Sequence, residues 1–263
     1  MKFILNAEDI KISIKNKNII KSFSYSFGQA KIYSIIGPNG SGKTTLLRAL
    51  SRNLKPSSGD VKLYGKSIYK QNTKEVAKKL AVLSQVHSSM TDIKVRDLVS
   101  YGRYSHRAWW KGNDSNDIDM IEWAIEKTGM KKFENRKINT LSGGERQRAW
   151  IAMAIAQKPN VLLLDEPTTF LDIGHQLELL KLIYKLNREE EITIIMVLHD
   201  LNQAVHYSDE LLIIKDGELV KDGSPWEMLE ENVFEKIFNV KGSITKDKET
   251  GKPIFFPLDV INN

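Results

Sequence analysis

The spacing of hydrophobic and polar positions changes several times along the chain. From Phe3 to Phe27 apolar and polar residues alternate, as in Ile10-Lys11-Ile12-Ser13-Ile14, and β-branched residues are common. Alternation is the pattern of strands with one buried face, so we expect antiparallel strands in this region. We also expect a short strand over Gly59–Gly65 and a buried strand over Leu80–Ser84.

Between Val95 and Thr140 the apolar residues recur at helical spacing instead. Val95–Tyr101 and Ile118–Thr128 carry this spacing, and the polar stretch Lys111–Asp117 separates them. Apolar residues at i, i+3, i+4 and i+7 form one face of a helix, so the pattern predicts a helical insertion over residues 95–140.

Strand and helix patterns then alternate. The expected strands are Val161–Leu164, Ile192–Val197 and Leu211–Ile214, and the expected helices are Gly174–Asn187 and Leu201–Val205. This alternation predicts an α/β fold with a mainly parallel sheet covered by helices. A tail follows from Gly223, with a helical stretch over Trp226–Phe238 and a short β-like end.

The most specific short segment is Gly37-Pro38-Asn39-Gly40-Ser41-Gly42-Lys43-Thr44, between the apolar run Ile32–Ile36 and the helical pattern Thr45–Leu50. Strand, glycine turn and helix are the context of a phosphate-binding loop. Glycines let the backbone N–H groups converge on an anion, and the helix adds its positive end. Lys43 would reach the β- and γ-phosphates, and the Thr44 hydroxyl would bind Mg²⁺. We therefore predict binding of a nucleoside triphosphate.

Two adjacent carboxylates end the apolar run Val161–Leu164. A buried strand delivers its last residues to the carboxyl edge of the sheet, where ligands bind in open α/β folds. Asp165 is placed to hold Mg²⁺ directly or through water, and Glu166 to orient and deprotonate an attacking water. An acidic strand end is common by itself, but together with a phosphate loop it predicts hydrolysis.

The segment Leu141–Gln147 reads Leu-Ser-Gly-Gly-Glu-Arg-Gln. Ser142 and Glu145 have the spacing of a capping box for the helix that follows. The box does not explain Gly143 and Gly144, because glycine inside a helix costs about 1 kcal/mol relative to alanine. A backbone that must be approached closely explains the pair, so we predict a second anion-binding helix N-terminus.

Taken together, these segments resemble the motifs of ATP-binding cassette (ABC) ATPases over essentially the whole chain. Residues 37–44 match Walker A, residues 161–166 match Walker B, and Leu141–Gln147 matches the signature motif. The resemblance implies a P-loop NTPase core with an N-terminal antiparallel β subdomain and an inserted α-helical subdomain. It implies one ABC ATPase domain over residues 1–263: a core of 1–94 and 141–222, a helical subdomain of 95–140 and a C-terminal extension of 223–263.

Other family elements match one residue at a time. Gln85 matches the Q-loop glutamine, which touches Mg²⁺ and senses the membrane partner, and Asp172 matches the D-loop aspartate at the subunit junction. His199 matches the switch histidine that contacts the γ-phosphate. The family usually carries an aromatic residue that stacks on adenine, at a position where this chain has Ile14 and Lys15.

The resemblance therefore implies a full set of site residues. The catalytic residues are Glu166, His199 and Lys43. The ATP-binding residues are Gly37, Pro38, Asn39, Gly40, Ser41, Gly42, Lys43, Thr44, Thr45, Gln85 and Asp165, of which Thr44, Gln85 and Asp165 are the Mg²⁺ ligands. The residues that contact the ATP of a partner subunit are Ser142, Gly143, Gly144 and Asp172.

The segment Asp97–His106 resembles the Gly-Arg-Tyr-Pro-His segment of importers for ferric siderophores, haem and cobalamin, with Ser105 in place of the proline. Thr169–Ile173 and His199–Ala204 are also typical of that group. The resemblance implies an ATPase subunit of a ferric-siderophore importer. A cobalamin or haem importer is the alternative, and a soluble ABC ATPase of DNA repair or translation is a more distant one.

Composition adds limits on the partners. No apolar run approaches the length of a membrane span, so the membrane partner must be another polypeptide. The resemblance implies a homodimer at the cytoplasmic face of the cell membrane, working with integral membrane permease subunits and an extracytoplasmic substrate-binding protein. A net charge of +6 could suit nucleic acid or an anionic membrane face, but such a mild excess is more often a solvated surface. We expect no nucleic acid partner. The absence of cysteine excludes disulfides and thiolate metal sites.

Overall fold

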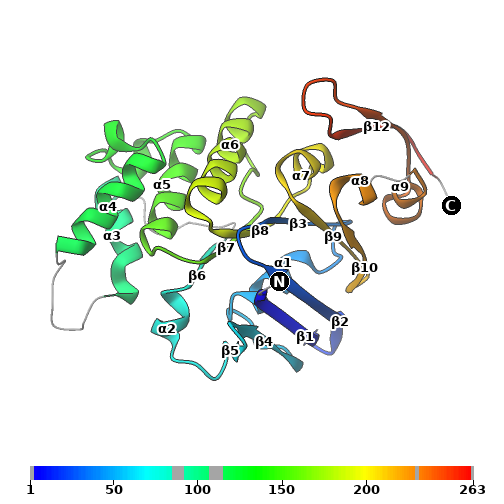
Figure 1. Ribbon diagram of the computed structural model, residues 1–263, viewed down its shortest axis with the longest axis horizontal. Helices are drawn as coiled ribbons and strands as arrows, with labels where there is room; N and C mark the ends of the chain where they lie inside the picture. Colours follow the sequence, from blue (N-terminus) through cyan, green and yellow to red (C-terminus); the bar gives the residue numbers. More distant parts are fainter. Residues whose placement is uncertain (1–2, 85–91, 107–114, 229–230, 262–263) are drawn as a thin grey trace. The chain divides into compact units, whose positions relative to one another are not determined.

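The structure is a computed structural model that describes residues 3–84, 92–106, 115–228 and 231–261. The chain divides into two compact units (Figure 1). The first unit comprises Met1–Tyr69 and Ile195–Asn263, and the second comprises Lys70–Ile194.

The first unit begins with antiparallel strands. β1 (Phe3–Ile14) and β2 (Lys17–Gly28) form a hairpin, and β4 (Ser58–Leu63) pairs with the other edge of β1. The two-residue strand β5 (Lys66–Ser67) pairs with β4. The antiparallel N-terminal strands predicted from the alternating pattern are confirmed.

A parallel region continues the same unit. β3 (Ile32–Ile36) lies between β8 (Thr193–Val197) and β9 (Glu210–Lys215), and it runs parallel to β9. All five residues of β3 and all five of β8 are buried, as expected for strands covered on both faces. β10 (Glu218–Gly223) returns antiparallel to β9 and joins β2.

Helices follow the strands of this region, and the C-terminal extension comes last. The helices are α1 (Lys43–Leu50), α7 (Leu201–Tyr207), α8 (Pro225–Met228) and α9 (Glu231–Phe238). β11 (Val240–Lys246) and β12 (Pro253–Val260) form an antiparallel hairpin, which Figure 1 shows next to α7. The Asn202 amide fixes this hairpin, since it accepts a hydrogen bond from the Phe255 N–H (2.9 Å) and donates to its carbonyl (3.1 Å).

The second unit combines two parallel strands with a helical bundle. β6 (Leu80–Leu83) pairs parallel with β7 (Val161–Asp165). The helices of the unit are α2 (Thr73–Ala77), α3 (Val95–Tyr101), α4 (Ser115–Lys127), α5 (Gly143–Ala156) and α6 (Ile173–Glu190), with 3₁₀ turns at Gly102–Ser105, Lys131–Phe133 and Ile138–Thr140. Figure 1 shows α3, α4 and α5 packed side by side, so the predicted helical insertion is confirmed.

The helical bundle is held by the apolar faces that the sequence pattern predicted. Val95, Leu98 and Val99 of α3 are fully buried, and so are Ala124 and Ile125 of α4. Burying such side chains stabilises the fold by about 25 cal/mol for each Å² of apolar surface removed from water. Within the described ranges, no helix is both long enough and apolar enough to span a membrane.

Candidate functional site

The glycine loop 37–44 has a backbone that only glycine can adopt at its key positions. Gly37 has φ +152° and Gly42 has φ +102°. A Cβ atom at Gly37 would lie 2.0 Å from the carbonyl oxygen of Ile214, and one at Gly42 would lie 2.7 Å from the side chain of Ile20. Both the torsion angles and the lack of space require glycine, so the loop is held in a fixed, tight turn.

Two side chains place hydrogen-bond donors inside this loop. The Lys43 ammonium is buried and donates to the carbonyl oxygens of Gly37 (2.8 Å) and Pro38 (2.9 Å). The Ser41 hydroxyl is also buried and has no hydrogen-bond partner among the described residues. Buried polar atoms are nearly always satisfied in folded proteins, so this hydroxyl fits a loop that receives a polar ligand.

The helix that starts at the loop adds to this arrangement. Gly42 is the N-cap of α1, and no side chain caps the helix. The first N–H groups of a helix have no partner within it, and its N-terminus carries a partial positive charge. An anion such as a phosphate is therefore a suitable ligand for this end of α1.

His199 lies in the same unit as the glycine loop. The N–H of Leu198 donates to the carbonyl oxygen of Ile35 in β3, the strand that leads into the loop (3.3 Å). His199 follows directly and is exposed. Asp200 then caps α7 by accepting from the N–H of Gln203 (2.8 Å).

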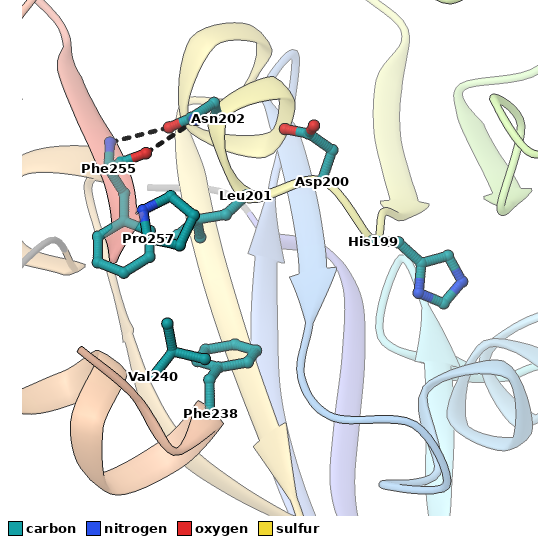
Figure 2. A pocket seen from close by; sticks show the side chains of 8 residues that line it. All are labelled: His199, Asp200, Leu201, Asn202, Phe238, Val240, Phe255 and Pro257. Carbon is teal, nitrogen blue, oxygen red and sulfur yellow. Dashed lines mark hydrogen bonds between the residues drawn. The ribbon is translucent and has the colours of Figure 1, made fainter. Parts of the chain in front are cut away.

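A cavity of about 260 Å³ lies next to His199, between α7 and the C-terminal extension (Figure 2). Its apolar wall comes from Leu201, Phe238, Val240, Phe255 and Pro257. Figure 2 shows the His199 ring turned away from these side chains.

The position at which the family usually carries an adenine-stacking aromatic residue is occupied by Ile14 and Lys15. Ile14 is half-exposed at the end of β1, and Lys15 occupies the turn with φ +48°. Phe23 is buried in the core. The Tyr25 hydroxyl donates to Glu210 (2.5 Å), and burial, the largest cause, raises the pKa of Tyr25.

The second unit holds the two carboxylates predicted for Mg²⁺ binding and hydrolysis, Asp165 and Glu166. Asp165 is buried at the end of β7, and Glu166 follows with the unusual φ of +52°. Thr169 fixes Glu166 twice: its N–H donates to the Glu166 carbonyl (3.2 Å), and its hydroxyl donates to Oε2 of the carboxylate (3.2 Å). A left-handed non-glycine residue costs about 1–3 kcal/mol and is often found at active sites. The geometry thus holds Glu166 in one orientation.

The predicted capping box at the start of α5 is confirmed. The Ser142 hydroxyl accepts from the N–H of Glu145 (3.3 Å), and the Glu145 carboxylate accepts from the N–H of Ser142 (2.9 Å). The hydrogen bond from the Ser142 backbone is the largest cause that lowers the pKa of Glu145. The glycines that follow are approached by side chains of the same unit: a Cβ atom at Gly144 would lie 2.5 Å from the His175 ring.

Asp172 caps α6. One carboxylate oxygen accepts from the N–H of His175 (2.9 Å), and the other accepts from His175 Nδ1 (2.6 Å). These bonds, with the backbone one as the largest cause, lower the pKa of Asp172. Asp172 and Gly144 therefore share His175 as a neighbour.

The predicted site residues fall into two groups. The first unit holds Gly37, Pro38, Asn39, Gly40, Ser41, Gly42, Lys43, Thr44, Thr45 and His199. The second unit holds Ser142, Gly143, Gly144, Asp165, Glu166 and Asp172. Gln85 lies outside the described residues.

The segment Gly102–His106 is anchored to the end of α5. Arg103 is buried, and it donates to Asp117 (2.7 Å) and to the carbonyl oxygen of Ala156 (2.8 Å). His106 Nε2 lies 2.8 Å from the carbonyl oxygen of Gln157, and burial is the largest cause that lowers the pKa of His106. The segment follows the end of α3, and through Arg103 it also joins α5 to α4.

Three of these contacts were not foreseen from the sequence: the Thr169 bonds to Glu166, the His175 contacts and the Arg103 anchor. The i, i+3 spacing of Asp172 and His175 is a signal for an N-cap. The contact of His175 with Gly144 and the burial of Arg103 join distant parts of the chain, and they have no local signal.

The chain is similar in sequence to a known family and to characterised members of it. The sequence model of the ABC transporter family matches residues 20–169. The petrobactin import ATP-binding protein FpuC of Bacillus anthracis is 51% identical over 227 residues, which are 86% of this chain and 83% of FpuC. The iron(3+)-hydroxamate import ATP-binding protein FhuC of Bacillus subtilis (strain 168) is 41% identical over 259 residues, 98% of this chain and 96% of FhuC.

A solved structure extends the agreement to the fold. The dimeric structure of MJ0796, a bacterial ABC transporter cassette, matches with a TM-score of 0.74 at 25% identity, covering 84% of this chain and 98% of MJ0796. The family match covers more than half of the chain, and the two relatives are similar over most of it. The chain therefore belongs to the ABC transporter ATP-binding proteins, which are ATPases.

Proposed function

We propose that this chain is the ATP-hydrolysing subunit of an importer for ferric siderophores. The main support for this cargo is the similarity to FhuC, which extends through the helical insertion and the C-terminal extension. FhuC is named for the import of iron(3+)-hydroxamate, and FpuC for the import of petrobactin. The segment Asp97–His106, with its resemblance to the same group of importers, supports this assignment.

In the proposed mechanism the glycine loop binds the phosphates of ATP. The ammonium of Lys43 and the hydroxyl of Ser41 are already inside the loop, so they can bind phosphate oxygens without a large rearrangement. Glu166 orients and deprotonates the attacking water, and His199 contacts the γ-phosphate. The fixed orientation of Glu166 supports this role, because a catalytic base must be held within reach of its proton.

The proposed Mg²⁺ ligands are Thr44, Gln85 and Asp165. Mg²⁺ prefers oxygen donors, and the hydroxyl of Thr44 and the buried carboxylate of Asp165 are such donors, so their chemistry fits the ion. When bound, the ion neutralises charge on the phosphate oxygens.

We further propose that two copies of the chain form a homodimer around two ATP molecules. Ser142, Gly143, Gly144 and Asp172 of one copy would contact the ATP held by the other. The dimeric cassette MJ0796 supports this arrangement. The whole chain would be one cassette at the cytoplasmic face of the membrane, with residues 95–140 as its helical subdomain. It would act on separate permease subunits that receive cargo from a binding protein.

The mechanism is tested with Glu166→Gln. We expect this variant to bind ATP, to lose about 10²–10⁴-fold in hydrolysis because the water is no longer deprotonated, and to elute as a dimer with ATP in size exclusion. Glu126→Gln, an exposed change in α4, is the control and should behave as wild type. A Glu166→Gln protein that hydrolyses ATP normally would contradict the assigned base.

The cargo is tested by uptake in cells that lack the gene. The panel contains labelled ferric siderophores, haem and cobalamin, with complementation by wild type or Glu166→Gln. We expect the loss of ferric-siderophore uptake alone, restored by wild type only. Loss of cobalamin or haem uptake instead would show that this compound is the cargo. Intact uptake of all three would contradict the importer assignment.

A further inference from the structure

The side chain of His175 lies between two of the residues proposed to serve the partner's ATP. On one side its Nδ1 donates to Asp172 Oδ2 at 2.6 Å, and its backbone N–H donates to Oδ1 at 2.9 Å. Both side chains are partly open to solvent, with exposed fractions of 41% for His175 and 69% for Asp172. The carboxylate of Asp172 is thus fixed by two donors from one residue.

On the other side the ring packs against the start of α5. A Cβ atom built on Gly144 would lie 2.5 Å from Cδ2 and 3.0 Å from Cγ of the ring. Real Cβ atoms do not approach so closely, so the ring occupies the space that any side chain at position 144 would need. The glycine that the capping box did not explain is explained here by the ring.

The loop between Glu166 and α6 is tied to the first turn of α6, and Leu171 of this loop lies close to the start of α5. The Gln176 amide donates to the carbonyl oxygens of Thr168 (3.3 Å) and Leu171 (3.0 Å). A Cβ atom at Gly143 would lie 3.3 Å from the side chain of Leu171. All of these residues belong to the second unit, so their relative positions are fixed within it.

We propose that His175 is a positioning residue for ATP hydrolysis. It sets Asp172 and Gly144 at a fixed spacing, so that both meet the ATP of the partner subunit together. The inference rests on the proposed function, since it requires Asp172 and Gly144 to act on the partner's nucleotide. A residue that only starts a helix would not need the ring, because the backbone N–H of residue 175 makes the same cap with any side chain.

Three substitutions separate the two contacts of the ring. His175→Asn keeps an N–H donor in the place of Nδ1 and an atom in the place of Cδ2. His175→Leu keeps the packing atoms and loses the donor, and His175→Ala loses both. Lys181→Ala, an exposed change on the same helix, is the matched control.

We measure kcat, KM for ATP, melting temperature and the Kd of the monomer for a fluorescent ATP analogue. For His175→Ala we expect a loss of about 10–100-fold in kcat, because small displacements of groups that surround a reacting centre have effects of this size. The monomer Kd should stay unchanged, since the monomer binds through its own glycine loop. His175→Asn should restore most of kcat, and His175→Leu should restore less.

Wild-type kcat in His175→Ala would overturn the proposal. A higher monomer Kd together with a lower melting temperature would also overturn it, because both changes mark a merely structural residue. The same holds if His175→Asn is as defective as His175→Ala. Full activity in His175→Leu would overturn the role of the bond to Asp172. Glu166→Gln is measured alongside, because normal hydrolysis in that variant would mark a failure of the proposed function rather than of His175.

A double substitution tests the contact with Gly144 directly. Gly144→Ala collides with the ring, so its effect should be smaller when His175→Ala has already removed the ring. Additive losses in kcat would show that the two residues act independently and would overturn the contact.

Discussion

The helices α1 and α5 both begin at a glycine-rich segment, yet their N-termini are built in opposite ways. α1 has Gly42 as its N-cap, no capping side chain and no acidic residue in its first turn. α5 has a complete capping box, with Glu145 as an acidic residue in its first turn. The start of α5 is capped by its own side chains, and the start of α1 is not.

This difference indicates when each end meets its ligand. The N-terminus of a helix is stabilised by negative charge, which Glu145 supplies to α5 and which α1 lacks. The uncapped end of α1 fits the phosphate proposed for the glycine loop. The start of α5 is capped in the single chain, so it needs no ligand before it meets the proposed partner's nucleotide.

Among substitutions at the two helix ends, the largest effect should come from Lys43→Ala. It removes the one side-chain cation held inside the glycine loop in the part of the chain that the structure describes. Loss of a group that binds transition-state charge costs about 10²–10³-fold, so we expect a fall of this size in ATP hydrolysis, measured as phosphate release.

Arg48→Ala is the control for this change, since it removes a cation from the exposed face of the same helix. It should hydrolyse ATP as wild type does. Unchanged turnover in Lys43→Ala would contradict the assignment of the loop.

A pair of serines sharpens the comparison. Ser41→Ala should raise the monomer Kd for ATP about tenfold, because a hydrogen bond to a charged group contributes about 1.5 kcal/mol. It should leave the melting temperature unchanged, because the structure gives this hydroxyl no partner among the described residues. Titration with a fluorescent ATP analogue and thermal unfolding measure the two effects.

Ser142→Ala should behave in the reverse way. Loss of the cap costs about 1 kcal/mol, or about 2–4 °C in melting temperature for a chain of this size. The monomer Kd should be unchanged. If both serines altered the same quantity, the contrast between the two helix ends would be wrong.

The smallest effect concerns the charge of Glu145. Its pKa in the folded chain is lowered, so its carboxylate stabilises the fold above the unfolded value of about 4.3 and loses this contribution as the pH falls through the folded value. Glu145→Gln keeps the capping hydrogen bond without the charge. At neutral pH its free energy of unfolding should be lower than that of wild type by less than about 1 kcal/mol, and its melting temperature should be slightly lower. The difference should vanish in acid, and a constant difference would contradict the role of the charge.

Local patterns predicted the elements well where neighbouring residues decide the outcome. The helix expected over Gly174–Asn187 is α6, Ile173–Glu190, and the strand expected over Ile192–Val197 is β8, Thr193–Val197. The capping box at Ser142 was also predictable, because it joins residues one helical turn apart. Of the helical stretch expected over Trp226–Phe238, the structure describes α8 as far as Met228 and α9 from Glu231, and residues 229–230 lie outside the described residues.

The sequence by itself determined the chemistry of this protein: a glycine loop after a strand, two carboxylates at the end of another, and a capped helix after a glycine pair. These features depend on spacings of a few residues, which the torsion angles and hydrogen bonds of one turn or one strand enforce. Only the tertiary structure decided that the His175 ring fills the space beside Gly144 and that Arg103 is buried on the carbonyl of Ala156. Such contacts join residues that are distant along the chain, and packing selects them only once the whole unit has folded.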